Sequence, residues 1–150
     1  MARGDSKVIS VNVGKNTVDG DYNGSTDTFS WVLVTNTYAS IDANAASLAL
    51  ADLTAVAAGG NYAGKTALTG VTVTQSGAVA TVDYDDITFA SNGSNPTTAT
   101  CLVIVNDTSV ADDVIKVTDL TTDGTTPVDL TQGFTFTVNA SGSFTYTANA

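Results

Sequence analysis

Residues 59 to 66 match the pattern of a phosphate-binding loop. The stretch reads Gly59-Gly-Asn-Tyr-Ala-Gly64-Lys65-Thr66, which satisfies G-x-x-x-x-G-K-T at each fixed position. Such a loop holds phosphates with the first amides of the helix that it opens. The following residues, Ala67 to Thr74, are β-patterned and interrupted by Gly70, so they favour a strand. We interpret the motif as a chance match, although the apolar run that ends at Asp107 resembles the metal-holding strand of such sites.

Residues 19 to 27 have the spacing of a calcium-binding loop. Oxygen-bearing side chains stand at alternate positions, and Gly24 occupies the position of the sharp turn. These side chains belong to Asp19, Asp21, Asn23, Ser25 and Asp27. Ser30 replaces the bidentate Glu that closes such a loop, and the flanking residues favour strands instead of helices. A weak Ca²⁺ site and an ordinary turn both fit these residues; we favour the turn and predict no metal or other cofactor.

Conventional acid–base catalysis lacks its usual residues in this chain. The net charge is −10, and all the acidic residues are Asp, because the sequence contains neither Glu nor His. Without His there is no Ser-His or Cys-His nucleophile pair. The adjacent acids Asp85-Asp86 and Asp112-Asp113 stand beside predicted turns, where solvated carboxylates are expected instead of a catalytic pair across a cleft. The sequence predicts a protein without enzymatic activity.

The acidic composition also excludes some partners. With a pI near 4.1 and only five basic residues, the chain is not expected to bind nucleic acid. No apolar run approaches the roughly 18 residues of a membrane span, and none follows the first seven residues. We therefore expect no membrane association, and we expect the chain to be made and to fold in a cytoplasm. Cys101 stands among apolar residues and is expected to be a buried, unreactive thiol.

The strongest structural signal is the apolar run from Cys101 to Val105. Its β-branched residues, its short length and the Asn-Asp stop predict a strand that is buried on both faces. Residues 29–38 predict a second strand that lies against it, with Trp31 and Leu33 on one face. Alternation within residues 133–147 predicts a C-terminal hairpin.

Turns at regular spacing predict an all-β fold of about nine short antiparallel strands, a β-sandwich of jelly-roll-like type. The first strand is expected from Lys7 to Val13. At most one short helix is expected near residues 42–53, and Asp52 to Val56 fits a short strand equally well. Residues 1–6 are expected to form a flexible N-terminal arm, followed by a single domain over residues 7–150.

Four segments together resemble small virion structural proteins of tailed bacteriophages, of the type encoded among head genes. They are Phe29 to Tyr38, Asp52 to Tyr62, Leu102 to Thr108 and Gly133 to Val138. The resemblance covers most of residues 28–148 and lies in the style and order of the segments. It implies a non-enzymatic capsid cement or decoration protein of the virion, a β-sandwich that is often trimeric. Such a protein sits on the outer surface of the head and bridges subunits of the major capsid protein.

The capsid contact is expected at the N-terminal arm, which carries two of the five basic residues. The arm consists of Met1, Ala2, Arg3, Gly4, Asp5, Ser6 and Lys7. A segment without apolar pattern could order on binding, and an ordinary frayed terminus fits these residues as well. Two other functions are also compatible with the sequence: a tail or fibre component that contacts the host surface, and a Ca²⁺-dependent carbohydrate-binding module. In the second, Trp31 and the tyrosines would stack on sugar rings, although their scattered positions favour core and rim.

Overall fold

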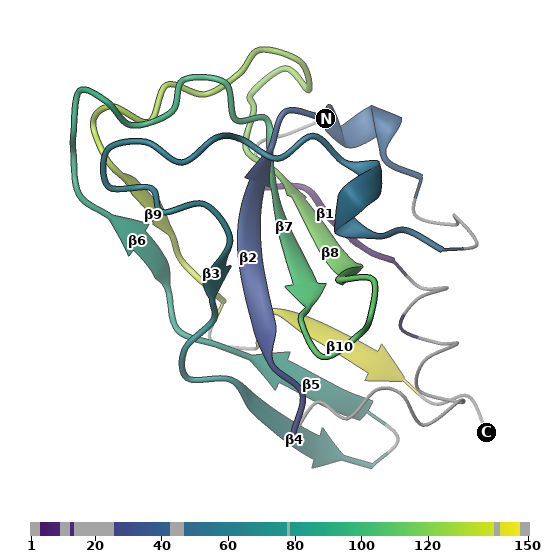
Figure 1. Ribbon diagram of the computed structural model, residues 1–150. Helices are drawn as coiled ribbons and strands as arrows, with labels where there is room; N and C mark the ends of the chain where they lie inside the picture. Colours follow the sequence, from purple (N-terminus) through teal and green to yellow (C-terminus); the bar gives the residue numbers. More distant parts are fainter. Residues whose placement is uncertain are drawn as a thin grey trace.

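The computed structural model describes residues 4–9, 13, 26–42, 47–77, 79–139 and 142–147. All strand pairs within these ranges are antiparallel, as predicted (Figure 1). In chain order the strands are β1 Ser6–Val8, β2 Phe29–Val34, β3 Thr66–Ala67, β4 Thr72–Ser76, β5 Val79–Asp83, β6 Ile87–Phe89, β7 Cys101–Asn106, β8 Asp113–Asp119, β9 Phe134–Phe136 and β10 Phe144–Thr147. No described helix reaches seven residues, and none is long and apolar enough to cross a membrane. The all-β prediction is confirmed.

The central sheet has the strand order β1-β8-β7-β2-β3. The apolar run that dominates the sequence forms β7 at its middle, and β2 pairs with it along its whole length, with Trp31 opposite Ile104. Every residue of β2 and β7 is buried. The prediction of two neighbouring strands, one of them buried on both faces, is confirmed. β-Branched residues suit this position because their side chains pack well on a pleated surface that is covered on both sides.

Each face of the central sheet is covered by a different part of the chain. Trp31 and Leu33 point into a core that also contains residues from the segments around β5, β6 and β9. Val32 and Val34 point to the opposite face, where they pack with Ile41 and other residues of the segment from 38 to 53. The other strands form a three-stranded sheet, β10-β5-β4, and the pair β6-β9. The architecture is therefore sandwich-like around a sheet with two covered faces (Figure 1).

The predicted C-terminal hairpin is wrong. β9 pairs with β6, with Phe134 opposite Phe89, whereas β10 pairs with β5. The two segments thus belong to different sheets even though they follow one another in the chain. Alternation identifies a strand and its buried face, but it carries no information on which strand is the partner. Here the partner is set by the aromatic core, in which the rings of Phe89 and Phe134 stack with centroids 5.4 Å apart.

The segment that could hold a helix near residues 42–53 contains only a three-residue 3-10 helix in its described part, η2, Leu50–Asp52. A second 3-10 helix, η1, Tyr38–Ser40, follows β2, so that strand is shorter than predicted. Ala55 forms an isolated antiparallel bridge with Val34, which agrees with the strand-like alternative for residues 52–56. Alanine-rich composition favours helix only weakly, and packing of the apolar side chains on the sheet overrides it here.

The first strand ends earlier than predicted. β1 stops at Val8, and the N–H of Val13 donates to the carbonyl of Ile9, which is a helical hydrogen bond. Residues that precede β1 form backbone hydrogen bonds with the last residue of β8. The N–H of Gly4 donates to Asp119, and the carbonyl of Asp5 accepts a hydrogen bond from the same residue. Residues 4–6 are therefore part of the sheet edge and not of a flexible arm, while residues 1–3 lie outside the described residues.

Candidate functional site

A β-bulge in the central sheet turns a lysine toward the interior. Ile104 pairs with Lys116 and Val105 with Val114, so Ile115 is an extra residue on β8. In a regular strand, neighbouring side chains point to opposite faces of the sheet, and the extra residue in β8 interrupts this alternation. With the bulge, Lys116 faces the same side as its partner Ile104, which belongs to the core under β5, β6 and β9. Only 6% of Lys116 is exposed.

The ammonium group of Lys116 begins a short chain of hydrogen bonds. Its Nζ donates to the carbonyl oxygen of Ser143 at 2.6 Å and to Ser143 Oγ at 3.0 Å. Ser143 Oγ in turn donates to the hydroxyl oxygen of Tyr84 at 2.8 Å. Gly142 has a φ of 94°, a conformation that favours glycine, and it lets the chain turn so that Ser143 reaches Lys116. Burial raises the pKa of Tyr84, while the bond from Ser143 works to lower it.

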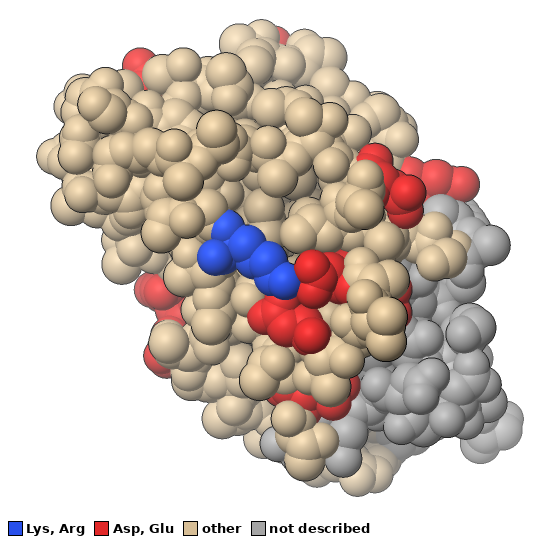
Figure 2. All heavy atoms as spheres, in the orientation of Figure 1, with Lys and Arg blue, Asp and Glu red and all other residues tan. Residues whose placement is uncertain are grey.

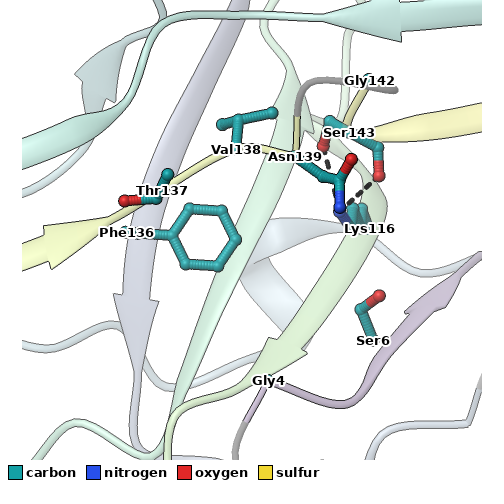
Figure 3. Close-up of a pocket in the computed structure, with 9 residues that line it drawn as sticks. All are labelled: Gly4, Ser6, Lys116, Phe136, Thr137, Val138, Asn139, Gly142 and Ser143. Carbon is teal, nitrogen blue, oxygen red and sulfur yellow. Dashed lines mark hydrogen bonds between the residues drawn. The ribbon is translucent and has the colours of Figure 1, made fainter.

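These groups border a pocket of about 290 Å³ (Figure 3). The walls come from four parts of the chain: Gly4 and Ser6 at the start, Lys116 on β8, residues 136–139 at and after β9, and the turn at residues 142–143. Figure 3 shows Lys116 and Ser143 on one side of the pocket and the ring of Phe136 on the other. The pocket thus combines one cation, several hydroxyl and amide groups, and an apolar wall.

Lys116 has no counter-charge in the part of the chain that the structure describes. Its hydrogen-bond acceptors are the neutral oxygens of Ser143, and burial lowers its pKa from the ordinary value. Lys65 is the opposite case, with Nζ 2.6 Å from Asp107 Oδ1 and 2.8 Å from Asp112 Oδ1. There partial burial works to lower the pKa, but the two carboxylates raise it overall. Figure 2 shows basic atoms in blue that touch acidic atoms in red on the face in view.

The resemblance to a phosphate-binding loop does not extend to its geometry. Thr66–Ala67 is strand β3, where a nucleotide site would need the start of a helix. The N–H groups of Gly59 and Tyr62 bond to each other's carbonyls, and the N–H of Asn61 donates to the side chain of Asn95. Three of the loop amides and the ammonium group of Lys65 are therefore used within the fold, which agrees with the interpretation of a chance match.

Two of the other acidic candidates accept hydrogen bonds within the fold. Asp86 accepts the N–H of Val138 at 2.8 Å, and Asp27 accepts the side-chain amide of Asn106 at 2.9 Å. Asp19, Asp21, Asn23 and Ser25 lie outside the described residues. Within the ranges that are described, no group of three or more His, Cys, Asp or Glu side chains is placed to hold a metal ion.

The basic end of the predicted capsid-binding segment folds back on the protein. Lys7 Nζ donates to the carbonyl of Tyr38 at 2.6 Å and to that of Ile41, and it lies 4.2 Å from the centre of the Tyr38 ring. Gly4 and Ser6 line the pocket. The structure thus brings part of this predicted segment beside Lys116, a residue that the sequence analysis did not select. The sequence does contain a pattern that could have identified Lys116, because it is a single lysine between apolar residues in Val114-Ile-Lys-Val117.

Cys101 is expected to resist thiol reagents in the native protein. Its side chain is fully buried, and burial raises its pKa to about 12. Because the thiolate is the reactive form, labelling should occur only through opening of the central sheet. The measurement is the rate of reaction with a chromogenic disulfide at neutral pH, compared with the rate in denaturant. Fast labelling without denaturant would show that β7 opens far more often than its burial implies.

No protein-family model, curated protein or solved structure matches this chain.

Proposed function

We propose that this protein is a non-enzymatic capsid decoration protein, bound to the outer surface of a phage head as a homotrimer and bridging subunits of the major capsid protein. The proposal starts from the resemblance of four sequence segments to small phage virion proteins. One structural observation supports it: these segments, which are far apart in the chain, come together in a single core. If the four segments were separate surface loops instead, the resemblance would not concern a shared structural unit.

The contacts between the segments are direct. β2 pairs with β7, which joins the first and third segments. The second segment joins them through Leu33, whose N–H donates to the hydroxyl of Tyr62 and whose carbonyl accepts the N–H of Val56. Phe134, from the fourth segment, stacks on Phe89, which in turn lies parallel to the ring of Trp31 at 6.4 Å. The resemblance therefore concerns one packed unit.

Such a protein acts through binding energy alone. Contacts that span neighbouring capsid subunits must be broken before the subunits separate, and several modest contacts on one particle add up to tight attachment. Among the described residues, β1 is an edge strand of the central sheet, and edge strands are places where a segment of a partner can pair. In the proposed assembly, the capsid contact lies along this edge and the residues that precede it.

The test is cosedimentation of the purified protein with expanded capsids of the encoding phage that lack it, with the mass in solution measured in parallel. We expect saturable binding and a trimeric mass. Absence of binding would contradict the proposal. Retention on a glycan column in Ca²⁺ with release by a chelator would instead support the carbohydrate-binding alternative, and binding to purified tails would support the tail alternative.

Deletion of residues 1–3 tests the role of the arm without disturbing the sheet. Because Gly4 to Val8 are held on β8, this truncation is expected to leave the melting temperature unchanged while it lowers capsid occupancy. The matched control is Lys65→Met, which removes a basic residue that is already paired with two carboxylates. Equal occupancy of the truncated and full-length proteins would place the contact elsewhere on the surface.

A further inference from the structure

We propose that the pocket beside Lys116 binds a carboxylate group. The group could belong to a small organic acid or to an acidic side chain or chain end of a docking protein, since the recognition chemistry is the same. The inference concerns a site that the decoration role does not require, and it stands or falls independently of that role.

The buried ammonium group is the first reason. An ammonium group has three N–H donors, and two bonds from Lys116 Nζ go to Ser143, on its carbonyl oxygen and its hydroxyl. A buried charge is costly unless it is paired, and Lys116 faces no carboxylate among the described residues. Lys65 is instead paired with two aspartates, and Lys7, which also donates to two neutral oxygens, lies over the ring of Tyr38. Lys116 lines the pocket with its buried side chain.

The shape and lining of the pocket are the second reason. Ser6 adds a hydroxyl group that can donate to a carboxylate oxygen, and Phe136 with Val138 adds an apolar wall. A volume of about 290 Å³ suits a carboxylate with a few attached carbon atoms, at the small end of ligand sites in proteins. The net charge of −10 repels carboxylates from most of the surface, so binding here depends on local geometry.

The same hydrogen-bond chain is poorly arranged for acyl transfer. A serine activated by a lysine needs N–H donors for the oxyanion that forms on the substrate. The backbone N–H of Ser143 donates to Val82 and that of Gly142 donates to Asn139, so neither is directed at a substrate. The geometry therefore favours binding of an anion beside Lys116 over attack by Ser143.

The experiment follows the Lys116 side chain by NMR in protein labelled with ¹³C at lysine Cε. The chain has four lysines, which keeps the spectrum simple. The probes are acetate, N-acetylglycinate as a model of a chain end, and N-acetylglutamic acid α-amide as a model of an acidic side chain. N-acetylglutaminamide is the neutral control. We expect a saturable shift of the Lys116 signal with carboxylates, little change at Lys65, and no effect of the neutral control.

The matched variants are Lys116→Met and Lys65→Met, with affinities measured from ligand-detected NMR. Because a charge-assisted hydrogen bond is lost, Lys116→Met is expected to weaken carboxylate binding about tenfold or more, while Lys65→Met leaves it unchanged. Tighter binding of the two capped amino acids than of acetate would point to a docking protein as the source, and equal binding to a small acid. The melting temperature of Lys116→Met is measured as well, so that a loss of binding can be separated from a loss of folding.

Three results would overturn the inference. They are a Lys116 signal that does not shift with any carboxylate, equal binding of the neutral amide, and unchanged affinity in Lys116→Met. The first is measured on the unmodified protein, so it decides the matter even if the variant folds poorly.

Discussion

Replacement of Asn95 by Ala is expected to lower the free energy of unfolding by about 3 kcal/mol, because the side chain joins three separate loops. Asn95 is only 3% exposed. Its Oδ1 accepts the N–H of Asn61 at 2.7 Å, and its Nδ2 donates to the carbonyls of Ala90 and Leu130, each at 3.0 Å. Ala would leave these backbone groups without their partner, and the bond to Leu130 is fully buried.

The measurement is equilibrium unfolding in urea at neutral pH. Asn92→Ala is the matched control, since Asn92 Oδ1 makes an exposed bond to the N–H of Ser94, and a loss below about 1 kcal/mol is expected there. A Cβ at Gly60 would lie 2.4 Å from Asn95 Oδ1, so Gly60→Ala should disturb the same cluster. If Asn95→Ala were no more damaging than the control, the three loops would be held by other contacts.

Replacement of Tyr62 by Ala is expected to cost about 4 kcal/mol, the range for a large aromatic side chain removed from a core. Tyr62 is 1% exposed, and its ring centre lies 5.6 Å from that of Trp31 and 6.0 Å from that of Phe89. Its hydroxyl accepts the N–H of Leu33 at 3.0 Å. β3 pairs with Ser30 and Trp31 and does not reach Leu33. The Tyr62 hydroxyl therefore accepts the Leu33 N–H in place of a carbonyl group from a neighbouring strand.

Tyr62→Phe separates the ring from the hydroxyl. It keeps the ring contacts and leaves the buried Leu33 N–H unpaired, so a loss of about 1 to 2 kcal/mol is expected. Hydrogen exchange of the Leu33 amide should become faster in this variant. Equal stability of Tyr62→Phe and the unmodified protein, with slow exchange at Leu33, would contradict the role of the hydroxyl.

Tyr62 is also expected to make the stability of the fold sensitive to alkaline pH. Burial raises the pKa of Tyr62, although the bond from Leu33 works to lower it. The unfolded chain loses this proton near pH 10, while the folded protein keeps it to higher pH, so stability falls as the pH rises above about 10. Tyr62→Phe should show a shallower loss of stability over that range in urea titrations.

The sequence alone was sufficient for the all-β class, for the central strand β7 and for its pairing with β2. These features depend on local patterns: β-branched residues, the length of an apolar run, and the alternation that places Trp31 and Leu33 on one face. Such patterns act over a few residues and are therefore visible without the fold.

Only the tertiary structure decided which strands are partners and where the pocket forms. β9 and β10 alternate as the two arms of a hairpin would, yet each pairs with a strand about 45 or more residues earlier, because the packed core selects partners that the local pattern does not encode. Lys116 faces the interior because one extra residue in β8 shifts the alternation at that point. Ser143 and Tyr84 reach it from other sheets and turns, so the site exists only once these distant segments have packed together.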